Sequence, residues 1–134
     1  MACSIVGALV VFTTVGNEEQ ANLIARELVC RRHAACVNIV PGIRSVYRWQ
    51  GKVCRDSEFL LVIKTEDHEY AAVEGAIREL HSYELPEILA FKVTRGEAGF
   101  LSWIAASLDK SKAGCADEED EIEEPLVPLD ETNY

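Results

Sequence analysis

The chain has 134 residues, is 49% hydrophobic and carries a formal net charge of −10. This length and apolar content predict one compact domain that can bury a core. The charge argues against the strongly basic surface that binds duplex nucleic acid, and no apolar run approaches the roughly 20 residues of a membrane-spanning helix.

The negative charge is concentrated at one end of the chain. Residues 113–134 hold nine carboxylates and no Lys or Arg, whereas residues 1–112 hold all 13 basic groups and 14 acidic ones. We therefore expect a folded, nearly neutral domain over residues 1–112 and an acidic, disordered tail over residues 113–134. The tail is either a solubilising segment or, through its apolar stretch 126–129, a binding site for a protein partner.

Five cysteines lie scattered along the chain, at positions 3, 30, 36, 54 and 115, with no Cys-x-x-Cys pair. This pattern predicts that most of the five are free thiols, and it argues against a disulfide framework or a structural zinc site. The apolar start of the chain lacks the basic leading region of a signal peptide, and its sequence continues directly into a predicted strand. We therefore expect a cytoplasmic protein.

Residues 5–13 are almost all apolar, which predicts a strand that is paired centrally or covered on both faces. Asn17, with Gln20 three residues later, predicts a capping box that begins a helix with an apolar stripe. Residues 35–50 predict a second strand, bent at Pro41-Gly42, and Gln50-Gly51 predicts a hairpin turn. Residues 52–64 predict the returning strand. These two strands are unusually long, so we expect them to project from the core as arms.

A second helix is predicted to begin at Thr65-Glu66-Asp67. Pro86 argues against helix around residue 86, so the helix should end before it. Residues 87–93 predict a fourth strand, and a short helix around Trp103 follows. The predicted order is β-α-β-β-α-β with an additional C-terminal helix. This order is typical of the ferredoxin-like split βαβ fold in the α+β class.

Several short motifs resemble the CutA family of divalent-cation tolerance proteins over residues 9–107. The most specific are Ala35-Cys36-Val37-Asn38, Pro41-Gly42, residues 45–52, Ile63-Lys64-Thr65, His81, Tyr83-Glu84, Pro86-Glu87 and Ser102-Trp103. The resemblance implies a fold similar to that of the PII signalling proteins and a homotrimer with clefts between subunits. It also implies a role in tolerance of, or response to, divalent metal ions, with copper as an associated metal.

In such a trimer the long second and third strands would pair with a neighbour's sheet and protect an apolar strand edge. Tyr47 and Trp49 point to the same face of the second strand. They are either aromatic anchors of the trimer interface or walls of a pocket between subunits, and we favour the interface.

His81 lies where the second helix ends and the chain leads into the fourth strand. One interpretation is structural, with His81 stabilising the helix end and Glu84 accepting hydrogen bonds from backbone donors. The other makes His81 a ligand for copper or another divalent metal, with Cys36 or Glu84 nearby. The spacing favours the structural interpretation. Some family members carry further ligands where this chain has Thr13 and Leu80.

The resemblance implies a ligand cleft between subunits, to which we assign Lys64, Tyr83 and Glu87. The chain contains no Gly-rich phosphate loop, and Cys36 and His81 lie in no recognised catalytic signature, so we predict a protein that is not an enzyme. Two alternatives stay open. One is a PII-like module that binds a small anion and signals through a partner, and the other is a structural trimer that recruits a partner through its acidic tail.

Overall fold

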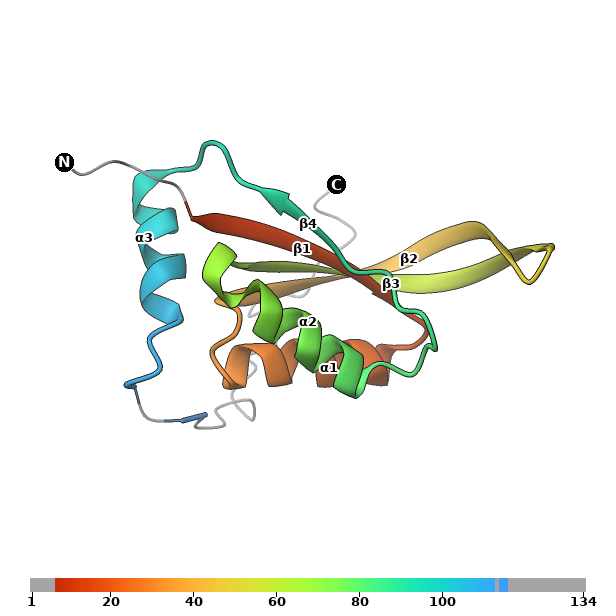
Figure 1. The fold of residues 1–134 in the computed structure, drawn as a ribbon, viewed down its shortest axis with the longest axis horizontal. Helices are drawn as coiled ribbons and strands as arrows, with labels where there is room; N and C mark the ends of the chain where they lie inside the picture. The colour runs from red at the N-terminus through yellow and green to blue at the C-terminus, as the bar shows by residue number, and fades with distance from the viewer. Residues whose placement is uncertain (1–6, 113, 116–134) are drawn as a thin grey trace, which may run out of the picture.

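The computed structural model describes residues 7–112, 114 and 115. Its elements are β1 (Ala8–Val15), α1 (Glu18–Cys30), β2 (Cys36–Trp49), β3 (Lys52–Glu66), the 3₁₀ turn η1 (Asp67–Glu69), α2 (Tyr70–Leu80), β4 (Leu89–Lys92) and α3 (Ala98–Ser107) (Figure 1). This order confirms the predicted α+β, ferredoxin-like fold. Most of the predicted acidic tail, and the first residues of the predicted first strand, lie outside the described residues.

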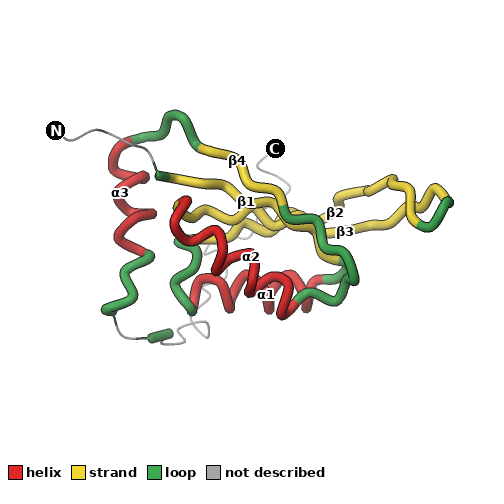
Figure 2. Tube along the Cα trace, in the orientation of Figure 1, coloured by secondary structure: helices red, strands yellow, loops and turns green. Residues whose placement is uncertain are grey.

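The four strands form one antiparallel sheet in the order β2-β3-β1-β4. β1 pairs with β3 on one side and with β4 on the other, as its continuous apolar sequence predicted. Helices α1 and α2 lie side by side against one face of the sheet, and α3 stands at the end of the sheet remote from the arm (Figure 2). No helix of the described residues is long and apolar enough to cross a membrane.

The core lies between this sheet and the two helices. Its largest fully buried apolar side chains are Val11 and Val15 of β1, Ile24 and Leu28 of α1, Leu61 and Ile63 of β3, and Val73 and Ile77 of α2. Each such side chain stabilises the fold by about 2 kcal/mol through removal of apolar surface from water. The core therefore holds the base of the arm and the end of α2 in fixed positions.

The first helix begins as predicted, but only half of the capping box forms. Asn17 Oδ1 accepts a hydrogen bond from the Gln20 backbone amide at 2.8 Å. The Gln20 side chain does not return to Asn17; its Nε2 donates to the Leu80 carbonyl at 2.7 Å. Gln20 thus satisfies one of the carbonyls left free at the end of α2 and ties the two helices together.

The predicted start of the second helix at residues 65–67 is wrong. Thr65 and Glu66 continue β3 and pair with Leu9 and Ala8 of β1. Thr65 is fully buried, and its hydroxyl donates to the His33 carbonyl at 2.6 Å. Sheet pairing and this hydrogen bond hold Thr65 in a strand, so regular helix begins only at Tyr70.

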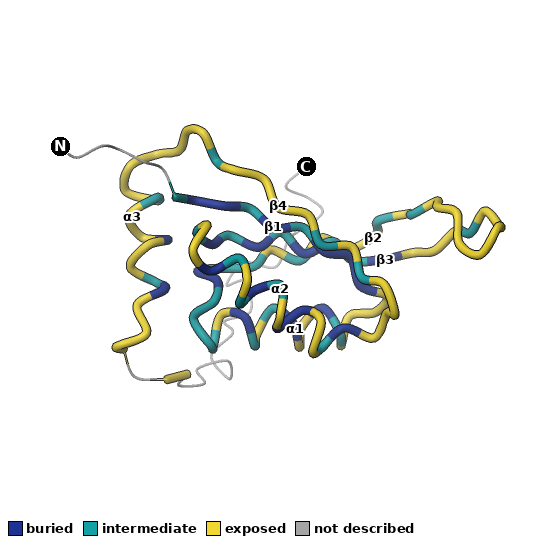
Figure 3. The backbone as a smooth tube through the Cα atoms, in the orientation of Figure 1, coloured by how far each residue is buried: buried dark blue, intermediate teal, exposed yellow. Residues whose placement is uncertain are grey.

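The hairpin of β2 and β3 projects well beyond the core as a long arm (Figures 1 and 3). A register shift between Val40 and Ile43 bends β2, where Gly42 has a φ of 75°. The turn at Gln50 and Gly51 has φ values of 49° and 79°, as expected for a two-residue turn with both central residues left-handed. Both features confirm the predicted bend and turn.

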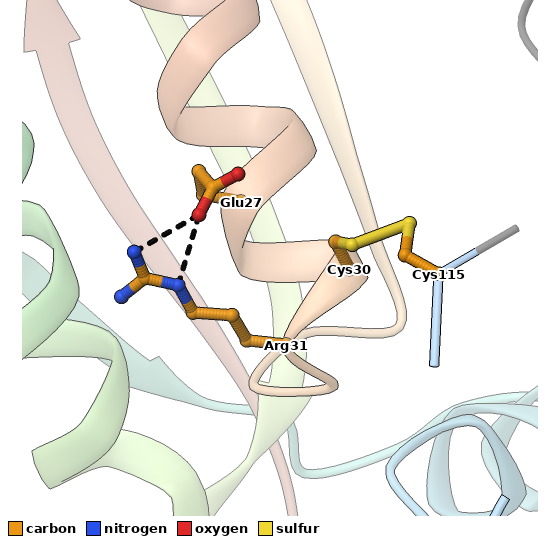
Figure 4. The surroundings of a disulfide bond; sticks show 4 residues. All are labelled: Glu27, Cys30, Arg31 and Cys115. Carbon is orange, nitrogen blue, oxygen red and sulfur yellow. Dashed lines mark hydrogen bonds and ion pairs between the residues drawn. A yellow bond between two sulfur atoms is a disulfide. The ribbon is translucent and has the colours of Figure 1, made fainter. Parts of the chain in front are cut away.

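We expected most of the five cysteines to be free, but two of the four described cysteines are paired with each other. Cys30, the last residue of α1, forms a disulfide with Cys115, and their Cα atoms lie 5.0 Å apart (Figure 4). Cys36 and Cys54 are free. The chain after α3 returns to the end of α1, where Lys110 donates to the Arg32 carbonyl and its ammonium lies 2.9 Å from a Glu69 carboxylate oxygen. These contacts bring Cys115 to Cys30, although the two are 85 residues apart in sequence.

Candidate ligand cleft

A cleft of about 870 Å³ opens between the base of the arm and the loop that joins α2 to β4. The arm contributes Tyr47, Trp49, Asp56 and Glu58 to its lining, and the loop contributes Tyr83, Glu84 and Glu87. The structure therefore brings together five of the residues that the sequence singled out, namely Tyr47, Trp49, Tyr83, Glu84 and Glu87.

The hairpin register places the arm residues of the cleft on one face. Trp49 lies opposite Lys52, Tyr47 opposite Cys54, and Ser45 opposite Asp56, and directly opposed residues of an antiparallel pair point to the same side. The Tyr47 hydroxyl donates to Asp56 Oδ2, a diagonal neighbour on that face. This hydrogen bond to a carboxylate, with some burial, raises the pKa of Tyr47 to about 12.

Tyr83 joins the loop to the arm. Its hydroxyl donates to Glu58 Oε2 at 2.7 Å. Burial and this hydrogen bond to Glu58 raise the pKa of Tyr83 far above the ordinary value of a tyrosine. The Tyr83 hydroxyl also lies close to the turn after β1, since a Cβ atom on Gly16 would be 3.0 Å from its oxygen. A glycine at that turn lets the tyrosine ring reach Glu58.

His81 holds the loop in place from the end of α2. It is 9% exposed, its Nε2 lies 2.7 Å from the Thr14 carbonyl oxygen, and its Nδ1 accepts from the Tyr83 backbone amide at 3.0 Å. This pattern assigns the neutral tautomer with the proton on Nε2, which donates to Thr14. The centroids of the His81 and Tyr83 rings are 4.6 Å apart. This geometry favours the structural interpretation of His81, because backbone groups bind both ring nitrogens.

The predicted metal ligands are not brought together within one chain. Cys36 of β2 lies opposite Lys64 of β3. His81 is hydrogen-bonded to the carbonyl of Thr14, which lies opposite Leu60, four residues before Lys64 on β3. At the rise of a strand this separates Cys36 from Thr14 by about 13 Å along the sheet, and β3 lies between their two strands. Among the described residues, no three His, Cys, Asp or Glu side chains are grouped so that they could share a metal ion. The described residues of one chain therefore do not fit the implied copper ion.

Lys64 is not among the residues that line this cleft of the single chain. Lys64 lies six residues along β3 from Glu58, and its Nζ donates to Asn38 Oδ1 on the neighbouring strand β2. Four carboxylates line the cleft, those of Asp56, Glu58, Glu84 and Glu87, and Arg48 is the one basic residue in its described lining. The net charge of the cleft favours a cation and disfavours a small anion.

Sequence reasoning missed Asp56 and Glu58. The signal was present, because a two-residue turn at Gln50-Gly51 fixes the pairing of the arm and so places both carboxylates on the face of Tyr47 and Trp49. The contact of Glu58 with Tyr83 had no such signal, since 25 residues separate the two.

Together these features define a ferredoxin-like α+β protein with a projecting β-hairpin and an acidic, aromatic cleft at its base. The family model described as CutA1 divalent ion tolerance protein matches residues 9–107. The chain belongs to this CutA family.

Known members of the family are similar in sequence and structure. The divalent-cation tolerance protein CutA of Thermus thermophilus is 47% identical over 95 residues, which cover 71% of this chain and 92% of that protein. Human protein CutA is 43% identical over 93 residues, which cover 69% of this chain and 52% of the human protein. The crystal structure of CutA from Xylella fastidiosa has a TM-score of 0.76 at 39% identity and covers 77% of this chain and 99% of that one.

The relatives differ in length and in named compartment. The chain spans 56% of an Arabidopsis thaliana relative named "Protein CutA, chloroplastic" and about half of the human protein. A similar solved structure, from Archaeoglobus fulgidus, is titled a periplasmic divalent cation tolerance protein, with a TM-score of 0.74 at 35% identity. The family therefore does not point to one compartment.

Proposed function

We propose that this protein is a non-enzymatic homotrimer that takes part in the tolerance of, or response to, divalent metal ions by capturing cations in clefts between subunits. The observation that carries the proposal is the acidic cleft at the base of the arm, whose lining holds four carboxylates and one guanidinium. Such a cleft raises the local concentration of cations. The cytoplasmic location is part of the proposal, although the Cys30–Cys115 disulfide is more typical of an oxidising compartment.

The exposed apolar surface of the single chain supports the trimer. Both edge strands of the sheet carry large side chains in contact with water, with Tyr47 41% and Trp49 39% exposed on β2, and Leu89 53% and Phe91 49% exposed on β4. Unpaired apolar edges favour uncontrolled association, and closure into a symmetric ring removes them. Tyr47 and Trp49 then become interface anchors that also border the cleft.

A divalent ion would need ligands from more than one copy of the chain, because the described residues of one chain offer no group of three. The available side chains at the cleft are carboxylates, which suit oxygen-binding ions, whereas copper prefers imidazole and thiolate. His81 would have to give up a backbone hydrogen bond to coordinate copper. Manganese-like ions therefore match the cleft better than copper does.

Calorimetric titration of metal-free protein with Mn(II) and Cu(II) tests the proposal. The double variant Glu84→Gln, Glu87→Gln should lose most of the Mn(II) binding, whereas Glu19→Gln, an exposed carboxylate outside the cleft lining, should bind as the wild type does. Saturable binding that the double variant retains would refute capture in this cleft.

Sedimentation velocity tests the trimer independently. Trp49→Ala should weaken association by about 2 kcal/mol per site through loss of an aromatic anchor. A wild type that sediments as a monomer at micromolar concentration would refute the trimer, and a Trp49→Ala variant with unchanged association would remove Trp49 from the interface.

A further inference from the structure

The disulfide between Cys30 and Cys115 lies at the surface, at the C-terminal end of α1 (Figure 4). Cys30 is partly exposed and Cys115 is exposed. Neither cysteine belongs to the arm or to the edge strands β2 and β4, through which the proposed trimer forms. The bond therefore stays accessible to a thiol from solution.

This disulfide attaches the end of the described chain to the domain. Before it, the last polar contacts with another part of the domain are those of Lys110, which donates to the Arg32 carbonyl and lies 2.9 Å from a Glu69 carboxylate oxygen. The hydrogen bonds of the next two residues are local, to Asp109, and the described residues 114 and 115 form none. Within the described chain after Lys110, the disulfide is thus the one bond to another element.

The position of this bond matters because the negative charge of the chain begins directly after it. The first carboxylate of residues 113–134 is Asp117, two residues after Cys115, and eight more follow without a Lys or Arg. Residues 1–112 are nearly neutral, with 13 basic and 14 acidic groups. With the bond closed, the acidic sequence starts from a fixed point on α1. With the bond open, it starts from a chain that is held only as far as Lys110.

We propose that Cys30–Cys115 is a site of reversible thiol–disulfide exchange, at which a cellular thiol detaches the acidic end of the chain from α1. Exposed disulfides are more readily reduced than the structural disulfides of secreted proteins, and the disulfides of cytosolic proteins are usually transient or redox-sensing. The inference rests on the proposed cytoplasmic location and is independent of metal capture.

The exchange begins at the more exposed sulfur. A thiolate of the reductant attacks Cys115 Sγ, the bond to Cys30 Sγ breaks, and Cys30 leaves as a thiolate that is protonated from solvent. A second thiol of the reductant resolves the mixed disulfide, so Cys115 becomes a thiol and the reductant ends as a disulfide. The protein gains two electrons and two protons in total. The domain stays folded, because its core is formed by β1, α1, β3 and α2 without this bond.

The test is maleimide labelling of the folded full chain, counted by mass spectrometry, after equilibration in a glutathione buffer poised at the cytosolic potential. We expect two more labelled thiols per chain than in protein kept without reductant, and an unchanged circular dichroism spectrum. Cys54→Ser, which removes a free cysteine, should keep this difference, whereas Cys115→Ser should lose it. Cys30→Ser should behave as Cys115→Ser does, and it serves if that variant does not fold.

Limited digestion with trypsin measures the detachment. Cleavage after Lys112, between Lys110 and the disulfide, should become several-fold faster on reduction, whereas cleavage after Arg95, in the exposed loop before α3, should not change. A disulfide that survives the glutathione buffer, unfolding on reduction, or five free thiols before reduction would overturn the inference. So would reduction that leaves cleavage after Lys112 unchanged. The Mn(II) titration tests metal capture separately, since neither cysteine lines the cleft.

Discussion

Replacing His81 by alanine should lower the free energy of unfolding by about 3 kcal/mol. The ring makes two hydrogen bonds, to the Thr14 carbonyl at 2.7 Å and from the Tyr83 amide at 3.0 Å. Leaving these two groups without a partner costs about 1 kcal/mol or more each, and the cavity left by a side chain that is only 9% exposed adds about 1 kcal/mol. The loop that carries Tyr83 should loosen at the same time.

Guanidinium unfolding, followed by circular dichroism at one fixed protein concentration, measures this change. His68→Ala is the matched control, because the His68 side chain is 64% exposed and its nitrogens lie 3.6 Å and 3.7 Å from the carboxylates of Glu66 and Glu69. Its loss should change the free energy by no more than about 0.5 kcal/mol.

Two results would refute the reasoning. If His81→Ala and His68→Ala have the same small effect, the two hydrogen bonds of His81 do not stabilise the fold. If His81→Ala abolishes Cu(II) binding while the unfolding midpoint stays the same, His81 is a metal ligand and the structural interpretation is wrong.

Two further predictions concern the arm and the disulfide. Hydrogen bonding to Asp56 raises the pKa of Tyr47 to about 12, so the stability that this bond contributes is complete below pH 10 and is lost as the pH rises through 12. Absorbance at 295 nm should show more than one late-ionising tyrosine, because the pKa of Tyr83 is raised as well. Asp56→Asn should move one of these ionisations to lower pH, and an identical titration curve would contradict the bond. Cys115→Ser should lower the free energy of unfolding by as much as about 4–5 kcal/mol under non-reducing conditions, because it opens a covalent loop of 85 residues. Cys54→Ser is the control, and equal unfolding midpoints for both variants would show that the disulfide does not stabilise the fold.

Local patterns in the sequence were sufficient for the elements and their order. The turn at Gln50-Gly51 sets the hairpin register, Asn17 begins α1, and the apolar run of β1 predicts its central place in the sheet. Each of these signals acts between residues that are close in the chain, through turn conformation, capping or burial of one face. The same holds for Tyr83, Glu84 and Glu87, whose loop position follows from the end of a helix near Pro86.

Tertiary structure alone decided the long-range contacts. The sequence contained no sign that Cys30 meets Cys115, that Gln20 leaves its own capping box for Leu80, or that Thr65 stays in a strand. Nor did it show that Glu58 is buried beside Tyr83 while Lys64 lies elsewhere. Such contacts depend on how the helices and strands pack against one another. A buried polar group forms a hydrogen bond with a partner that this packing places within reach. The sequence pattern therefore predicted the family and the projecting hairpin arm, whereas tertiary packing determined which side chains meet in the cleft.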